Sequence, residues 1–407
     1  ADGFLALAAG DVRAAERASG EAVRRLPGAP LTRLLQAQTA QLRGDDAAAH
    51  DVFLAMTDDP ATRVVGLRGL YIEADRRGDR ETARHYAELA RQTSGTTAWA
   101  GRALLRHQVS EGDWEGALRT LSTYADSRVL EKKATRRTRA VILTAMAQEC
   151  EAGDPEKARQ YALEAHDLAP DLVPAAAVAG RVLARLGEIR RAAKVLETTW
   201  KVAPHPEIAE AYAHVRTGDS ALDRLKRVEY LQRMRPQADE GRLALARAAM
   251  EAREWQKARD AILPVIRTRP TQNALILMAE IEEAETGDRG RAREWLARAV
   301  HAPRDAAWIA DGIVLEHWAP ASPVTGRLDA VEWRVPVESL AGPEAFHIDE
   351  ADLAPPPLPA PAEPEDVSDE AIPPAVAATE TALIVEPEAA DAAPAPPRPA
   401  EAAPAAS

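Results

Sequence analysis

Along most of the chain, apolar side chains recur at the three- and four-residue spacing of one helix face. Leu67, Leu70 and Tyr71 form one such group, and Leu275 and Ala279 belong to another. The strict alternation of apolar and polar residues that marks a strand is scarce, and so are the turn dipeptides of β-hairpins. The pattern therefore predicts an all-α protein.

The helical pattern is interrupted by turn markers at a nearly constant interval. A Gly-Asp pair or a related dipeptide begins at eight positions, most of them 34 residues after another: Gly10, Gly44, Gly78, Gly112, Gly153, Gly187, Arg253 and Gly287. The step from Gly112 to Gly153 is 41 residues, which indicates a seven-residue insertion. An alanine lies five residues after every marker, and a proline follows six of them by 16 or 17 residues. Gly218-Asp219 followed by Pro236 indicates a degenerate ninth unit, in which Asp223 replaces the alanine.

Each unit can be interpreted as a helical hairpin. Glycine ends the first helix, aspartate caps the second, alanine allows the two helices to approach closely, and proline stops the second helix. Residues 1–304 resemble the tetratricopeptide repeat, a 34-residue helix–turn–helix unit that stacks into a superhelix. We therefore expect a solenoid of about nine hairpins. Trp114, Trp255 and Trp295 keep a fixed place in the repeat, and with Trp99 and Trp200 they are interpreted as repeat core.

The repeat markers stop after Pro303, yet apolar residues continue. Three of the eight tryptophans lie between Trp308 and Trp333, and the glycines and prolines among them argue against a long helix. We expect an ordered loop or short strand in residues 305–342, acting as a cap on the apolar face of the last repeat.

This segment also carries a family resemblance. The stretches Trp-x-x-Asp-Gly from Trp308, Glu-His-Trp-x-Pro-x-Ser-Pro-x-Thr-Gly from Glu316 and Glu-Trp-Arg from Glu332, with the start of the chain from Gly3, resemble HemY. HemY proteins are bacterial inner-membrane proteins linked to late haem biosynthesis. The resemblance spans about residues 3–336.

The resemblance implies a membrane-anchored scaffold that supports tetrapyrrole synthesis through protein contacts and through contacts with haem or porphyrin. HemY proteins carry two membrane helices before the repeats, so we expect this chain, which begins at Ala1, to be the soluble part of such a protein. The alternative is a generic tetratricopeptide adaptor for envelope assembly or secretion, without a tetrapyrrole role. No G-x-G-x-x-G fingerprint is present, which argues against the flavoenzyme protoporphyrinogen oxidase that shares the name.

A haem or porphyrin site would need an axial ligand and cations for the propionates. The best candidate group is His317 beside Trp318, together with Arg327 and Arg334. The alternative is a packed cap in which His317 hydrogen-bonds to backbone.

Charge is distributed unevenly along the chain. Residues 343–407 hold 14 acidic residues and one basic residue, which accounts for the whole net charge of −13. Half of the 30 prolines also lie there, so we expect a disordered acidic tail. Residues 1–342 are neutral overall but include a basic run, a candidate patch for anionic lipid or a partner, formed by Arg128, Lys132, Lys133, Arg136, Arg137 and Arg139.

The sequence lacks the common catalytic and metal-binding motifs. There is no H-E-x-x-H, C-x-x-C, G-x-S-x-G or phosphate-binding loop, and the nine histidines show no metal-ligand spacing. The single cysteine, Cys150, excludes an internal disulfide. No aromatic residues are interleaved with the basic run, which argues against nucleic acid. We therefore expect a non-enzymatic protein that binds partners on the concave face of its repeats.

Overall fold

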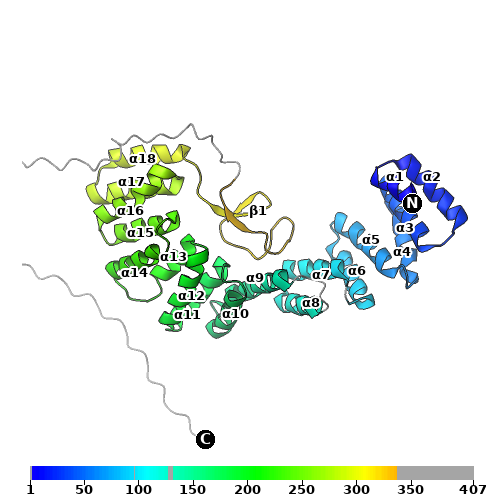
Figure 1. Ribbon diagram of the computed structural model, residues 1–407, viewed down its shortest axis with the longest axis horizontal. Helices are drawn as coiled ribbons and strands as arrows, with labels where there is room; N and C mark the ends of the chain where they lie inside the picture. Colours follow the sequence, from blue (N-terminus) through cyan, green and yellow to red (C-terminus); the bar gives the residue numbers. More distant parts are fainter. Residues whose placement is uncertain (1, 96, 127–131, 337–407) are drawn as a thin grey trace, which may run out of the picture. The chain divides into compact units, whose positions relative to one another are not determined.

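The structure, a computed structural model, describes residues 2–95, 97–126 and 132–336 (Figure 1). All of them belong to the first of two compact units, Ala1–Leu353. The second unit, Ala354–Ser407, and the predicted acidic tail from residue 343 onward lie outside the described residues.

The described residues form eighteen helices in nine consecutive pairs, each helix in contact with the next. The first helices of the pairs are α1 (Asp2–Ala8), α3 (Pro30–Arg43), α5 (Arg63–Arg76), α7 (Ala98–Ser110), α9 (Lys132–Cys150), α11 (Val173–Arg185), α13 (Pro206–Ala213), α15 (Asp239–Glu251) and α17 (Gln272–Thr286). The second helices are α2 (Val12–Arg25), α4 (Asp46–Asp58), α6 (Arg80–Thr93), α8 (Trp114–Asp126), α10 (Pro155–Leu168), α12 (Ile189–Val202), α14 (Ala221–Met234), α16 (Trp255–Thr268) and α18 (Arg289–His301). The predicted all-α tetratricopeptide solenoid of about nine hairpins is confirmed.

The turn markers have the roles that the sequence predicts. The side chains of six aspartates accept hydrogen bonds from backbone N–H groups in the first turn of the second helix: Asp11, Asp45, Asp79, Asp113, Asp154 and Asp288. Six marker glycines adopt a positive φ between 70° and 82°, and Arg253 takes that conformation without a glycine, at 58°. All eight marker alanines are buried.

The degenerate unit is a complete hairpin of α13 and α14. Its capping residue is Ser220 rather than Asp219, because the Ser220 hydroxyl accepts the N–H of Asp223 while the Asp223 carboxylate accepts the N–H of Ser220. This reciprocal capping box explains why an aspartate stands where other units have alanine.

After α18 the chain forms a small antiparallel sheet in the order β2-β1-β3. Its strands are β1 (Ala307–Ala310), β2 (Ile313–Leu315) and β3 (Glu332–Arg334). Asp311 and Gly312, both with positive φ, turn β1 into β2. Such a two-residue turn matches the twist of the paired strands. The segment thus contains short strands joined by ordered loops, in agreement with the expected ordered loop or short strand.

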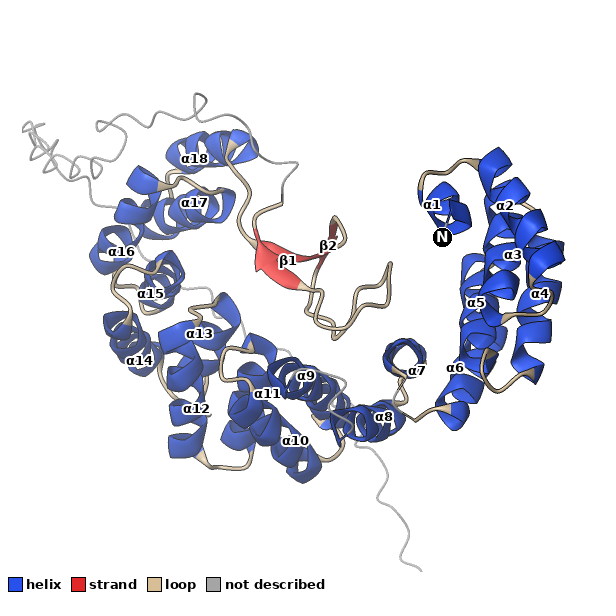
Figure 2. Ribbon diagram, turned by 45° about the vertical axis from the view of Figure 1, so that its right-hand side comes forward, coloured by secondary structure: helices blue, strands red, loops and turns tan. Residues whose placement is uncertain are grey.

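The sheet does not cover the last repeat, so the expected position of the C-terminal cap is wrong. Trp308 and Trp318 belong to the same core cluster as side chains of α9, α11 and α13. The core cluster of the last repeats contains no residue from the sheet. On α18, Leu296 and Val300 remain 44% and 73% exposed. Figure 2 shows the sheet beside α9, α11 and α13.

None of the described helices combines the length and apolar character needed to cross a membrane.

Candidate functional site

The C-terminal sheet is held on the repeats by an aromatic cluster. The Trp308 indole N–H donates to a Glu207 carboxylate oxygen at 2.8 Å. The His205 ring lies 5.0 Å from the Trp308 ring and 4.2 Å from the Trp333 ring, centroid to centroid. Burial lowers the pKa of His205 to about 4, so this side chain is neutral at physiological pH.

An ion-pair bridge fixes the segment between the strands. Arg137 on α9 donates to both carboxylate oxygens of Asp329, at 3.0 and 3.2 Å, and to Asp171 at 2.9 Å. A two-pronged guanidinium–carboxylate pair fixes orientation as well as distance. Arg137 therefore positions the chain that precedes β3 against the first helix of the fifth repeat.

Residues of the C-terminal motifs are joined by hydrogen bonds into one loop. The Asp311 carboxylate accepts hydrogen bonds from the Ser322 and Thr325 hydroxyls, the latter at 2.7 Å. These bonds, first the one from Ser322, lower the pKa of Asp311. The Ser322 oxygen also accepts the N–H groups of Val324 and Thr325. Asp311 thus connects the β1–β2 turn to the loop at residues 322–328.

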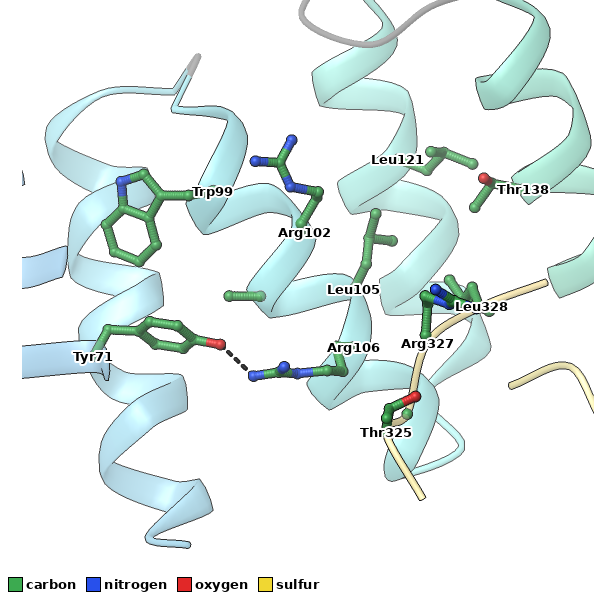
Figure 3. Close-up of a pocket in the computed structure, with 12 residues that line it drawn as sticks. Tyr71, Trp99, Arg102, Leu105, Arg106, Leu121, Thr138, Thr325, Arg327 and Leu328 are labelled. Carbon is green, nitrogen blue, oxygen red and sulfur yellow. Dashed lines mark hydrogen bonds between the residues drawn. The ribbon is translucent and has the colours of Figure 1, made fainter. Parts of the chain in front are cut away.

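This loop forms one wall of a cavity of about 560 Å³, which we call the arginine cavity (Figure 3). The repeats supply the other walls from α5, α7, α8 and α9. The lining residues are Tyr71, Trp99, Arg102, Ala103, Leu105, Arg106, Leu121, Thr138, Thr325, Gly326, Arg327 and Leu328. The close approach of loop to helix requires Gly326, because a Cβ there would lie 3.2 Å from Cγ of Arg106 and its φ is +65°.

The arginine cavity is cationic and partly aromatic. Its lining includes three arginines and no acidic residue. Arg106 is already engaged, since it donates to the Tyr71 hydroxyl and, at 2.7 Å, to Asp75. Arg102 and Arg327 are exposed and make no ion pair with another described residue.

One face of the cavity is an aromatic pair. The rings of Tyr71 and Trp99 lie 5.3 Å apart at an angle of 44°, and both side chains are half-buried (Figure 3). Burial raises the pKa of Tyr71, so its hydroxyl stays protonated at neutral pH. The apolar part of the lining includes Leu105 and Leu121, which are 6% and 2% exposed. Such a surface can bind an apolar or aromatic group together with negative charge.

The four residues predicted to hold haem do not lie together around one site. The His317 side chain is 87% exposed and lies 3.9 Å from the Glu316 carboxylate, while Trp318 is buried in the core beside the repeats. Arg327 lines the arginine cavity without the other three, and Arg334 lies beside Glu332 on β3. An axial ligand needs a pocket that excludes water on the ring, and His317 lacks one. The alternative, a backbone hydrogen bond from His317, is not seen either.

The predicted basic run is divided by the structure. Arg128 lies outside the described residues. Arg137 bonds to Asp171 and Asp329, and Arg139 bonds to Glu164 at 2.8 Å. Lys132, Lys133 and Arg136 are exposed on the first turns of α9 and make no ion pair with another described residue. The lipid or partner patch stays a prediction for those residues alone.

Sequence reasoning missed most of the cavity. The repeat pattern predicts core positions for Tyr71, Trp99 and Trp200. Trp200 is fully buried, whereas Tyr71 and Trp99 line the cavity. One signal was available: Arg102 and Arg106 are four residues apart on the helix that begins just before Trp99. Among the described residues, no group of three His, Cys, Asp or Glu side chains could hold a metal ion.

No protein-family model matches the chain. A probable magnetosome protein, Mms48 of Magnetospirillum gryphiswaldense, is 28% identical over 229 residues, which are 56% of this chain. The match covers 51% of that protein, so the chain spans about half the length of this curated relative.

Several solved structures are similar at low identity. A tetratricopeptide repeat protein from Parabacteroides merdae is 15% identical, with a TM-score of 0.31, over 58% of this chain and 98% of that one. The structure of Naa15/Naa10 bound to HypK-THB is 11% identical, with a TM-score of 0.35, over 73% of this chain and 57% of that one. The P58(IPK) TPR domain is 18% identical, with a TM-score of 0.21, over 73% of this chain and 95% of that one. The assignment of the fold as a tetratricopeptide solenoid is based on the observed helix pairs. The HemY resemblance stays a prediction.

Proposed function

We propose that this protein is a non-catalytic scaffold that binds partner proteins on the repeat face carrying the C-terminal sheet. The observation that carries the proposal is the arginine cavity, which is lined by an aromatic pair and by two arginines that make no ion pair with another described residue. A surface with apolar and cationic groups but no reactive constellation suits binding rather than catalysis.

The pathway proposed for this scaffold is late tetrapyrrole biosynthesis. The support is the HemY resemblance of the C-terminal motifs. Asp311, Ser322 and Thr325 come from those motifs and together build the loop that walls the cavity. The second candidate is an assembly adaptor without a tetrapyrrole role, which the name of the magnetosome relative favours.

Cross-linking and affinity capture in the parent cell would distinguish the tetrapyrrole scaffold from the assembly adaptor. The bait is the full-length protein, compared with a double variant, Arg102→Glu with Arg327→Glu. Capture of tetrapyrrole enzymes by the wild type and their loss with the variant is the expected result. Capture of assembly or secretion proteins alone would favour the second candidate, and identical partners for both baits would refute binding through the cavity.

A further inference from the structure

We propose that the arginine cavity binds a short acidic peptide segment of a partner protein, with an aromatic or large aliphatic side chain flanked by carboxylates. This deepens the proposed scaffold function and rests on it. The size of the cavity supports a ligand site, because its volume of about 560 Å³ lies within the range of roughly 300–1,000 Å³ usual for such sites.

The charge of the cavity lining indicates that the bound segment is negatively charged. All three charged lining residues are arginines, and among the residues that the structure describes the only carboxylate bound to any of them is Asp75, on Arg106. Arg102 and Arg327 come from different walls of the cavity, one from α7 and one from the loop (Figure 3). Each guanidinium can bind one carboxylate through two parallel hydrogen bonds. A segment lying between the walls can therefore engage both with acidic side chains.

The apolar part of the lining decides what lies between the carboxylates. Tyr71 and Trp99 present their rings to the cavity, and Leu105, Leu121 and Leu328 complete an apolar surface. Aromatic rings favour a tilted or offset partner ring, which a phenylalanine or tyrosine side chain can supply. The Arg106–Tyr71 hydrogen bond holds the Tyr71 ring in place before any ligand arrives.

The loop wall depends on the Asp311 hydrogen bonds. Asp311 holds Ser322 and Thr325, and Thr325, Arg327 and Leu328 line the cavity. Asp311 is a positioning residue, since it has no place in the lining itself. Its loss should weaken peptide binding by freeing the loop that carries Arg327.

The test is fluorescence anisotropy with the full chain and a short fluorescein-labelled peptide, in which phenylalanine and leucine are flanked by aspartate and glutamate. Two comparison peptides carry lysines in place of the acids, or serines in place of the apolar pair. We expect binding of the acidic-apolar peptide only, weakened as salt is raised to about 0.5 M. Arg102→Glu and Arg327→Glu should each weaken it by about tenfold or more.

Matched variants keep the result interpretable. Arg190→Glu makes the same charge change on the exposed surface of α12 and should leave binding unchanged. Asp311→Ala should weaken binding several-fold, and Asp311→Asn, which keeps an accepting oxygen and tolerates positive φ, should restore part of it. Circular dichroism of each variant confirms that the repeats remain folded.

Two further probes separate failure of this inference from failure of the scaffold function. If haemin or vesicles of anionic phospholipid bind in an Arg102- and Arg327-dependent manner while the peptide does not, the peptide inference is wrong. Equal weakening by Arg190→Glu would also overturn it, because the effect would then be one of net charge. Partner capture that persists in the double variant would locate the scaffold's binding surface elsewhere.

Discussion

At the scale of single residues, a few side chains decide how the C-terminal sheet meets the repeats. His205 caps α13, because its Nδ1 accepts the N–H of Glu207 at 3.2 Å, and it packs against Trp308 and Trp333. It is 2% exposed, and its Nε2 has no hydrogen-bond partner among the described residues. A buried imidazole with one open nitrogen is tolerated while it is neutral and becomes costly when it is protonated.

His205 should therefore make the protein less stable in mild acid. Its pKa is about 4 when folded against an ordinary value of 6.5, so the unfolded chain takes up the proton first as the pH falls. Stability is full above pH 6.5 and is lost progressively towards pH 4, and at pH 5 the loss is about 2 kcal/mol. Urea denaturation followed by tryptophan fluorescence at pH 7.5 and pH 5 measures this loss of unfolding free energy.

The control for this prediction is His205→Asn, which keeps a helix-capping side chain but does not titrate. The variant should be less stable at both pH values and should show a smaller difference between them. Burial also lowers the pKa of His107 and His166, so some acid sensitivity will remain. An unchanged pH difference in His205→Asn would show that His205 is not the sensitive group.

At the scale of elements, the hairpins depend on signals only a few residues apart. Most turns place a residue in the left-handed region, and in most of them an aspartate or serine side chain caps the next helix. The turn before α16 departs from the rule, because Arg253 adopts a φ of 58° where other repeats have glycine. A side chain in this conformation is strained by contact of its Cβ with the backbone.

Replacing Arg253 by glycine should stabilise the hairpin of α15 and α16. We expect a gain of about 0.5–1 kcal/mol, since relief of the strain exceeds the added flexibility of the unfolded chain. Chemical denaturation followed by circular dichroism measures it. The reciprocal change at an equivalent turn, Gly287→Arg, should lower stability, and a loss in both variants would contradict the explanation.

At the scale of the whole molecule, the C-terminal segment returns to repeats well before it in the sequence. Val331 and Trp318 share a core cluster with α9, α11 and α13, and Asp329 binds Arg137 from 192 residues away. The last helix, in contrast, keeps Val300 73% exposed. The segment therefore stabilises the middle of the solenoid rather than its end.

Deleting residues 306–336, which leaves the hydrogen bond between Asp305 and the start of α17 in place, tests this arrangement. Loss of the buried Trp308 and Trp318 contacts should expose apolar surface on α9, α11 and α13 at a cost of several kcal/mol, at about 1.5–3 kcal/mol for each large side chain. Hydrogen–deuterium exchange should show faster exchange in those helices and little change in α17 and α18. Faster exchange confined to α17 and α18 would instead support a cap on the last repeat.

Local sequence signals specify the repeat. The 34-residue period, the capping aspartates, the buried alanines such as Ala15 and the terminating prolines are local signals, because a helical hairpin is specified by residues close together in the chain. The position of the C-terminal segment, and the meeting of Tyr71, Arg102 and Arg327 at one cavity, follow from the packing of the folded chain. Their meeting depends on which faces of distant helices and loop become neighbours, and no single periodic pattern records that. The same reason separates His317, which a motif placed beside Trp318, from any enclosed pocket.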